Sequence, residues 1–577
     1  MSSTNGTAVN GTATNGANGV NGVNGVNGSA VKDTFSNGTS SPIKVDVLII
    51  GAGFGGCYSL YRLRQQGFST HLFEAGSTLG GVWHWNRYPG ARVDSEIPYY
   101  QYSMPEVWRK WNWTERFPSG VELQEYFKHV DTTLKLSQDI SYNSIVVGAT
   151  YDKASATWTV TTESGTTAVC RYLICATGSS FKPHFPAFQD LDKYQGELVH
   201  STRWPTNGDA GITKGKRVAI IGSGATAVQC TQEIAKQAEH LTVYIRTASI
   251  SLPMFQRPLS EFEQRVNKSI YSGLLKHCRA TKSGLGYDPR PGTTFDLTDE
   301  EREELWEELW HRGGFNFNQS NHRDFLVNPK TGRMMYEFWA KKTRARMTNA
   351  SKAAFLVPEE PPFIFGTKRM SLEQDYYECC DQDNVAIVDL KVNPITRFTE
   401  SGIVTADGVE TQFDMVVMAT GFDAMTGSLT NMNVTGVDGI TFRERWQDGV
   451  FTHLGLCSSG CPNLFMVYGP QAPTAFTNGP VFLEVQVDVI VDFLKKMRAE
   501  GIASIEAQRP AEEKWKQAIQ DANDKTLLGQ TDSWYMGANI PGKKREQLNY
   551  LGGIQQYEVE CRASLDNNFE GFTVVKA

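Results

Sequence analysis

Two short apolar runs, each followed at once by a glycine-rich turn, set the pattern of the chain. The first run spans residues 45–50 and the second spans residues 217–221. After each turn comes a stretch with helical patterning and then another apolar run, which ends at Glu74 in the first case and at Arg246 in the second. An apolar run bounded by polar residues predicts a buried parallel strand, and strand–turn–helix–strand is the βαβ unit. The pattern therefore predicts an α/β fold with two Rossmann-like dinucleotide-binding domains.

The rest of the chain fills in this plan. Residues from about 255 to 350 read as helical, and Thr298 with Glu301 fits a capping box that starts one of these helices. A further group of strands at roughly 385 to 420 ends in Ala419-Thr420-Gly421. We therefore expect the second nucleotide domain to be inserted into the first. The predicted division is a leader at 1–41, a first nucleotide domain at 42–180 and 386–577, and a second at 181–385 with a helical insert at about 255–350.

The leader repeats the pair Asn-Gly and contains almost no large apolar side chain. Such a segment cannot bury enough apolar surface to offset the entropy of ordering it, so we expect residues 1–41 to be disordered.

The first turn fits the dinucleotide fingerprint G-x-G-x-x-G. Its glycines, which permit a tight turn and close approach of a pyrophosphate, are Gly51, Gly53 and Gly56. The helix that follows turns its free N–H groups toward the phosphates. Glu74 ends the next strand at the usual spacing, where a carboxylate accepts the two ribose hydroxyls of an adenosine. The pattern predicts a dinucleotide with free ribose hydroxyls, as in FAD.

The second turn differs in the charge at its strand end. Gly222, Gly224 and Ala227 fit G-x-G-x-x-A, and the matching strand is followed by Arg246 and Thr247 instead of an acid. A cation with a hydroxyl suits a 2′-phosphate, which a carboxylate would repel. This site is therefore predicted to bind NADPH rather than NADH.

Composition excludes several other classes of protein. The 577 residues carry a net charge of −7, which argues against nucleic acid or an anionic membrane surface as partner. No run of 18 apolar residues and no secretory signal is present, so a cytoplasmic enzyme without a membrane segment is expected, as a monomer or weak oligomer. The ten cysteines include no Cys-x-x-Cys pair, so no metal site is predicted.

Two longer segments resemble the fingerprints of the type I Baeyer–Villiger monooxygenases. Residues 80–94 fit G-G-x-W-x-x-x-x-[FY]-P-G-x-x-x-D throughout. Residues 194–205 fit F-x-G-x-x-x-H-x-x-x-W-P, except that Tyr194 replaces the first aromatic residue. The resemblance continues through 365–369, 419–424 and 533–543 and so covers nearly everything after residue 43, although Ala248 stands where the family often has proline.

The resemblance implies a specific reaction with two cofactors. NADPH reduces FAD, and the reduced flavin captures O₂ as a C4a-peroxide. This peroxide attacks a ketone, and the adduct rearranges to an ester or a lactone with one oxygen atom inserted.

The resemblance also assigns roles to individual residues. Arg369 is expected to be the principal catalytic residue, because a fixed guanidinium stabilises anionic oxygen without losing its proton. Asp94 is expected to position it. The residues expected to contact the cofactors are Lys368 at the NADPH 2′-phosphate, Trp534 at the NADP ribose, and Trp83 and Tyr100 at the flavin.

Two other functions stay open from the sequence. One is a flavin monooxygenase that oxygenates nitrogen or sulfur, which would not need the Asp94–Arg369 pair. The other is a catalytically inactive NADPH-binding regulator. The sequence does not identify the ketone, and Met425, Phe476 and Phe482 are compatible both with the substrate pocket and with the core.

Overall fold

Strand β1 (Ile43–Ile50) lies inside an eight-stranded sheet because its second half has no polar side chain to expose. It pairs in parallel with β2 (Thr70–Phe73) on one side and with β6 (Thr167–Cys175) on the other. The strand order is β17-β4-β5-β6-β1-β2-β3, with β18 paired to the end of β6. The other strands are β3 (Ile140–Ser141), β4 (Val146–Asp152), β5 (Thr157–Thr162), β17 (Val434–Thr435) and β18 (Leu464–Met466).

The structure is a computed structural model that describes residues 41–205 and 208–577. The predicted disordered leader lies outside the described residues, apart from residue 41. Residues 42–577 form one compact unit.

The second glycine turn follows β8, in a sheet of five strands that are all parallel. Its order is β12-β9-β8-β16-β7. The strands are β7 (Glu197–His200), β8 (Arg217–Ile221), β9 (His240–Ile245), β12 (Val385–Asp389) and β16 (Met415–Met418).

The strand pairing in this sheet differs from one predicted domain boundary. The sequence pattern predicts that the chain returns to the first domain at residue 386, but β12 and β16 both pair within the second sheet. Between them lies a small antiparallel sheet of β13 (Ile395–Phe398), β14 (Gly402–Thr405) and β15 (Glu410–Gln412). An apolar run looks alike in either sheet, so the pattern alone could not assign β16. The chain leaves the second sheet only after Met418.

The two connections between the sheets lie side by side. The outgoing segment follows β6 and the returning one follows β16, and they meet in an antiparallel bridge between Pro183 and Phe422. The His184 N–H donates to the Gly421 carbonyl at 2.9 Å, and the Asp423 N–H donates to the Lys182 carbonyl at 3.0 Å. The connection is therefore a short two-stranded ribbon.

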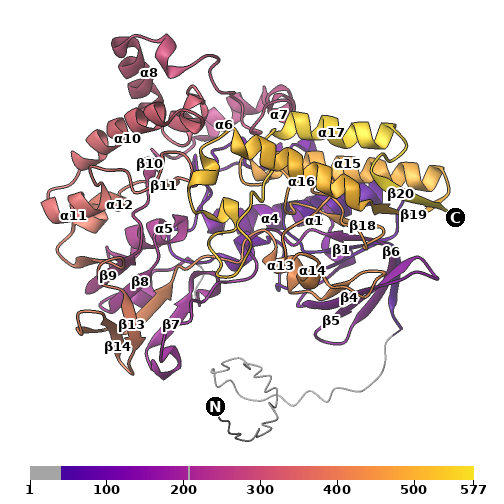
Figure 1. The fold of residues 1–577 in the computed structure, drawn as a ribbon, viewed down its shortest axis with the longest axis horizontal. Coiled ribbons are helices and arrows are strands. Elements are labelled where there is room, and N and C mark those ends of the chain that lie inside the picture. The colour runs from indigo at the N-terminus through magenta and orange to yellow at the C-terminus, as the bar shows by residue number, and fades with distance from the viewer. Residues whose placement is uncertain (1–40, 206–207) are drawn as a thin grey trace, which may run out of the picture. The chain divides into compact units, whose positions relative to one another are not determined.

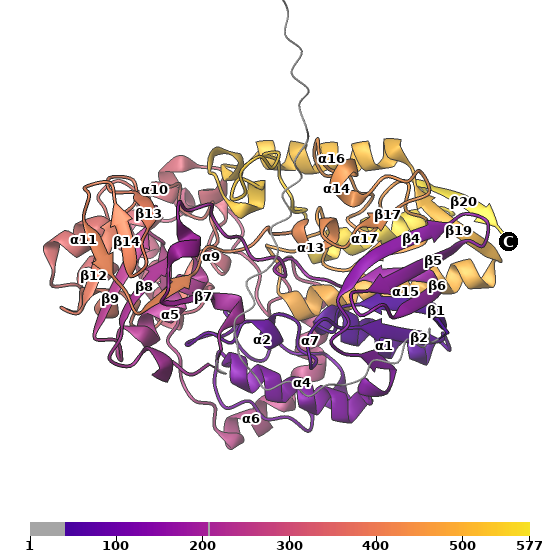
Figure 2. The same cartoon turned by 90° about the horizontal axis from the view of Figure 1, so that it is seen from below.

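Helices cover both sheets (Figures 1 and 2). Helix α1 (Phe54–Gln65) packs on α15 (Gly479–Ala499) beside the first sheet, and α5 (Ala225–Ile234) packs on the second. The helices of the insert occupy residues 261–356, close to the predicted 255–350. They are α6 (Glu261–Lys268), α7 (Tyr271–Arg279), α8 (Asp299–Arg312), α9 (Asn316–Gln319), α10 (Pro329–Arg344) and α11 (Ala350–Leu356).

The predicted capping box is confirmed at the start of α8. Thr298 accepts from the Glu301 N–H, and the Glu301 carboxylate accepts from the Thr298 N–H at 2.8 Å. The remaining helices are α2 (Val82–Trp85), α3 (Pro105–Trp108), α4 (Gly120–Leu134), α12 (Tyr376–Asp381), α13 (Gly427–Thr430), α14 (Phe442–Arg445), α16 (Arg509–Asp524) and α17 (Ile554–Asp566). The remaining strands are β10 (Ser251–Pro253), β11 (Ser371–Glu373), β19 (Ile502–Ala507) and β20 (Phe572–Lys576).

None of the helices among residues 41–205 and 208–577 combines the length and the apolar character that crossing a membrane requires.

Candidate functional site

The first glycine turn has a shape that only glycine allows. Gly51 has φ +99°, and a Cβ placed there would lie 2.6 Å from the Ala176 carbonyl oxygen. At Gly56 a Cβ would lie 1.8 Å from the Gly51 carbonyl oxygen. Gly53 caps α1 and has no side chain to accept from the first N–H groups, and the first turn holds no acidic residue. Those N–H groups therefore remain available to an anion such as a pyrophosphate.

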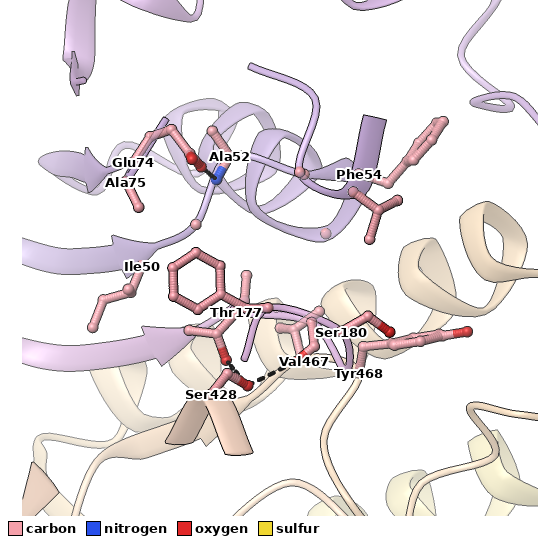
Figure 3. Close-up of a pocket in the computed structure, with 18 of the residues that line it drawn as sticks. Ile50, Ala52, Phe54, Glu74, Ala75, Thr177, Ser180, Ser428, Val467 and Tyr468 are labelled. Atoms are coloured by element: carbon pink, nitrogen blue, oxygen red, sulfur yellow. Dashed lines mark hydrogen bonds between the residues drawn. The ribbon is translucent and has the colours of Figure 1, made fainter. Parts of the chain in front are cut away.

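A cavity of about 300 Å³ opens beside this turn. Figure 3 shows Ala52 and Glu74 on one wall and Thr177, Ser428 and Tyr468 across from them. Ser428 accepts from Thr177 at 3.2 Å and donates to the Gly178 carbonyl at 2.8 Å, which joins α13 to the segment after β6. The sequence marks Thr177 only as part of Ala176-Thr177-Gly178, which follows an apolar strand as Ala419-Thr420-Gly421 does, and it gives no sign of Ser428.

Glu74 lies in this cavity wall with 3% of its surface exposed. Its two carboxylate oxygens accept from the backbone N–H groups of Ala52 at 2.5 Å and Gly76 at 2.6 Å. Burial raises the pKa of the carboxyl, and the two N–H bonds act against that rise. A carboxylate has about four acceptor positions, so two remain for ligand hydroxyls. The turn and this carboxylate thus fit a dinucleotide with a free ribose diol.

The second turn repeats the geometry of the first. Gly222 has φ +135°, and a Cβ there would lie 2.3 Å from the Ala419 carbonyl oxygen. Gly224 caps α5 without a side-chain hydrogen bond, and Ala227 is buried against the sheet. Ser223 donates to the Thr247 carbonyl at 2.7 Å, which ties the turn to the end of β9.

Two cations stand near this second turn. Arg246 is exposed at the end of β9. The Lys368 ammonium lies 5.0 Å from the centre of the Phe363 ring. Burial lowers the pKa of Lys368, and the nearby charge of Arg246 lowers it further. The charge of Arg246 therefore disfavours that of Lys368, and an anion placed between the two would be stabilised by both.

Arg369 and Asp94, which are 275 positions apart in the sequence, form an ion pair. The guanidinium donates to Asp94 Oδ2 from Nη2 at 2.5 Å and from Nε at 3.1 Å. Its side chain keeps 35% of its surface accessible. Burial lowers the pKa of Arg369, but the charge of Asp94 and its hydrogen bond outweigh this effect, so the pKa lies above the usual value. The Arg369 guanidinium is therefore held in one place and stays protonated.

The charges of this ion pair act on tyrosines that line two cavities. Burial raises the pKa of Tyr468, in the wall of the first cavity, to about 12, and the charge of Arg369 acts against that rise. Arg369 itself lines a second cavity of about 70 Å³ together with Lys368 and Tyr535. Tyr100 lines the first cavity and accepts from the Trp83 indole N–H at 3.1 Å, with Trp83 buried behind it.

The remaining predicted residues have mixed outcomes. Trp534 packs edge-on against Tyr535, with ring centroids 4.6 Å apart. Phe476 lines the second cavity, whereas Phe482 and Met425 are fully buried core residues. Sequence reasoning missed Arg323 in the same cavity wall, because an arginine in a polar stretch reads as a surface residue.

His200 joins the second sheet to the connecting ribbon. Its Nε2 lies 3.3 Å from the Gly421 carbonyl and its Nδ1 lies 2.9 Å from Thr202 Oγ1. Burial lowers the pKa of His200 to about 4. Both ring nitrogens are engaged and the imidazole is neutral, so His200 has no free proton donor or acceptor for a substrate.

The lowered pKa of His200 predicts a loss of stability in acid. The unfolded side chain titrates near 6.5 and the folded one near 4, so the stabilisation is complete above pH 6.5 and is lost as the pH falls toward 4. At pH 5 the cost is about 2 kcal/mol. We expect His200→Gln to show a smaller drop in Tm between pH 7.5 and pH 5 than the wild type. An equal drop in both proteins would contradict this assignment.

Comparisons with known proteins agree with this geometry. The family model for pyridine nucleotide-disulphide oxidoreductases matches residues 45–269. An FAD-binding monooxygenase of Aspergillus aculeatus is 43% identical over 93% of this chain and 90% of its own length. A cyclopentanone 1,2-monooxygenase of a Comamonas species is 42% identical over 92% and 96%.

A solved structure extends the match to the whole fold. The cyclohexanone monooxygenase of a Rhodococcus species, bound to NADP⁺, superposes with a TM-score of 0.89 at 32% identity, over 93% of this chain and all of that one. The two glycine turns and the Arg–Asp pair agree with the near full-length similarity to ketone monooxygenases. The chain accordingly belongs to the type I Baeyer–Villiger monooxygenases.

Proposed function

We propose that the chain is an FAD- and NADPH-dependent monooxygenase that inserts one oxygen atom of O₂ next to a ketone carbonyl, giving an ester or a lactone. The observation that carries the proposal is the Arg369–Asp94 ion pair, whose arginine lines the second cavity and whose charges act on Tyr468 in the wall of the first. Oxygenation of nitrogen or sulfur has no need of such a pair.

The first cavity would hold FAD. The uncapped N-terminus of α1, behind Gly51, Gly53 and Gly56, would bind the pyrophosphate, and Glu74 would accept the ribose hydroxyls. Tyr100, held by Trp83, would contact the flavin. When bound, FAD would accept a hydride from NADPH and pass electrons to O₂.

The second turn would hold NADPH. The α5 N-terminus behind Gly222, Gly224 and Ala227 would bind its pyrophosphate. Arg246, Thr247 and Lys368 would bind the 2′-phosphate, since two cations and a hydroxyl match its charge and its acceptors. Trp534 would contact the ribose next to the nicotinamide.

Arg369 would act on the reacting atoms. Insertion of oxygen next to a carbonyl develops negative charge on oxygen, and a preorganised guanidinium stabilises that charge where it forms. Asp94 would keep the guanidinium in place and protonated. Water would have to be kept from the reacting atoms, because it otherwise diverts activated oxygen to H₂O₂.

A product screen tests the reaction itself. Purified holoenzyme should be yellow, should oxidise NADPH faster when a ketone is present, and should add one oxygen atom to the ketone by mass spectrometry. Linear, monocyclic and polycyclic ketones should be tried beside an amine and a thioether. A protein that oxygenates only the heteroatoms, or that contains no flavin, would refute the proposal.

The choice of NADPH is tested at Arg246. Arg246→Ala should raise the KM for NADPH about 10-fold, because one charge-assisted bond to the 2′-phosphate is lost, while kcat changes little. The KM for NADH should not move, since NADH has no such phosphate. Arg397→Ala, at an exposed arginine of β13, is the matched control. Equal use of NADH and NADPH by the wild type would contradict the prediction.

The cytoplasmic location and the monomeric or weakly oligomeric state expected from the sequence stay predictions.

A further inference from the structure

The second cavity contains a cation that the proposed reaction does not use. Arg323, which follows α9, lines this cavity together with Arg369, Asn318, Phe315, Phe476 and Tyr535. The cavity therefore runs from the proposed catalytic arginine to a second arginine, between aromatic and polar walls.

Arg323 has little to balance its charge. Among the described residues its side chain makes one hydrogen bond, from Nη1 to Gln319 Oε1 at 3.0 Å, although a guanidinium has five N–H donors. Within residues 41–205 and 208–577 no carboxylate lies within 4 Å of it. The adjacent Asp324 is engaged elsewhere, accepting from Thr294 at 2.8 Å and Thr331 at 2.7 Å. Burial lowers the pKa of Arg323, as expected for a cation without a counter-ion.

The surroundings add positive charge instead of removing it. Lys282 lies close enough for the charge of Arg323 to lower its pKa, after the larger effect of burial. The amide of Asn318 lines the same cavity. A half-buried arginine without a counter-ion is costly unless an anion pairs with it.

We propose that Arg323 is an anion-binding residue of the substrate pocket, and that the ketone substrate of this enzyme carries a carboxylate. The proposal rests on the proposed function and names its substrate class. The planar fork of a guanidinium matches a carboxylate with two parallel hydrogen bonds, and Asn318 can donate a third from its amide nitrogen. The carbonyl end of the substrate would then face Arg369 across the cavity.

A phosphate of the nicotinamide cofactor is the other anion that could reach this region. Lys368 lines this cavity as well, but the glycine turn of α5 with Arg246 already offers a phosphate site. Arg323 shares its wall with Phe315, Phe476 and Tyr535, and this apolar lining favours the substrate. The experiment below separates the two anions.

Binding to the oxidised, NADP⁺-loaded holoenzyme tests the proposal without turnover. The probes are cyclic ketones that bear a carboxymethyl group, each beside its methyl ester, and the readouts are calorimetry and the flavin absorbance difference. The wild type should bind each acid about 10- to 100-fold more tightly than its ester. Arg323→Met should reduce this ratio to about one, and Arg323→Lys should keep part of it. Arg333→Met, at an exposed arginine of α10, is the matched control and should keep the full ratio.

Three results would overturn the proposal. The first is equal binding of acid and ester by the wild type. The second is a ratio that survives in Arg323→Met. The third is a Kd for NADP⁺ that rises in Arg323→Met as much as the Kd of the acid, which would assign Arg323 to the cofactor. FAD content and Tm of each variant show whether it has folded, and Arg323→Lys serves if the methionine variant has not.

Failure of this inference and failure of the proposed function look different. An enzyme that oxygenates no ketone contradicts the proposed function, whatever its binding ratio. An enzyme that oxygenates neutral ketones but binds acid and ester alike contradicts only the role of Arg323.

Discussion

Arg369→Ala should bind FAD and be reduced by NADPH, yet should fail to oxygenate ketones. The loss of one charged group that stabilises a developing anion costs about 3–4 kcal/mol, a factor of about 10² to 10³ in rate. NADPH consumed under air should therefore appear as H₂O₂ instead of ester. The measurements are ester yield by mass spectrometry, H₂O₂ yield, and anaerobic bleaching of the flavin by NADPH.

Two further variants sharpen this test. Arg369→Lys should not restore the rate, because an ammonium lacks the planar fork that holds Asp94 and the substrate oxygen together. Asp94→Ala should give a weaker form of the same defect. Arg333→Ala, on the exposed face of α10, is the matched control. An Arg369→Ala enzyme that converts ketone to ester with near wild-type coupling would refute the mechanism.

Gly56→Ala should lose most of its affinity for FAD. The added methyl group would lie 1.8 Å from the Gly51 carbonyl oxygen, so the turn and α1 must move apart at the place where a pyrophosphate would sit. Overpacking of this kind costs about 3 kcal/mol, which is about 100-fold in Kd. Titration of deflavinated protein with FAD, followed by flavin fluorescence, measures the change.

The control for this substitution is a glycine with room around it. At Gly148 in β4 a Cβ would meet nothing within 4 Å, so Gly148→Ala should bind FAD as the wild type does. Far-UV circular dichroism shows whether each variant is folded. A Gly56→Ala protein that is purified with a full complement of FAD would contradict the prediction.

Local pattern was sufficient to predict the two nucleotide turns. A buried strand, a glycine turn and the charge at the next strand end lie within about 25 residues of each other. The structure places Gly51 and Glu74 in one cavity wall, and the Gly222 N–H donates to the Tyr244 carbonyl near the end of β9. The capping box at Thr298 was predictable for the same reason. Such features depend on backbone geometry, which neighbouring residues determine.

Features that depend on distant contacts were less accessible. The pairing of Asp94 with Arg369 came from a family resemblance and not from spacing, because 275 residues separate them. The sheet to which β16 belongs was misassigned, since four buried apolar residues suit either sheet. Arg323 gave no signal, because a charged residue in a polar stretch is normally solvent-exposed, whereas packing of the insert leaves this one half-buried.

The two-stranded ribbon at Pro183 and Phe422 has a mechanical consequence. A single flexible linker would let the two sheets rotate relative to each other about several axes. Two linkers joined by hydrogen bonds resist twisting, so the sheets can move mainly by bending of the ribbon. The two halves of the enzyme should therefore open and close by a hinge motion about one axis. Gly421, with φ +80°, lies in the ribbon and is a candidate hinge residue. Small-angle scattering with and without NADP⁺ would register this opening. A hinge with one degree of freedom returns the nicotinamide site to the same register against the flavin site after every turnover.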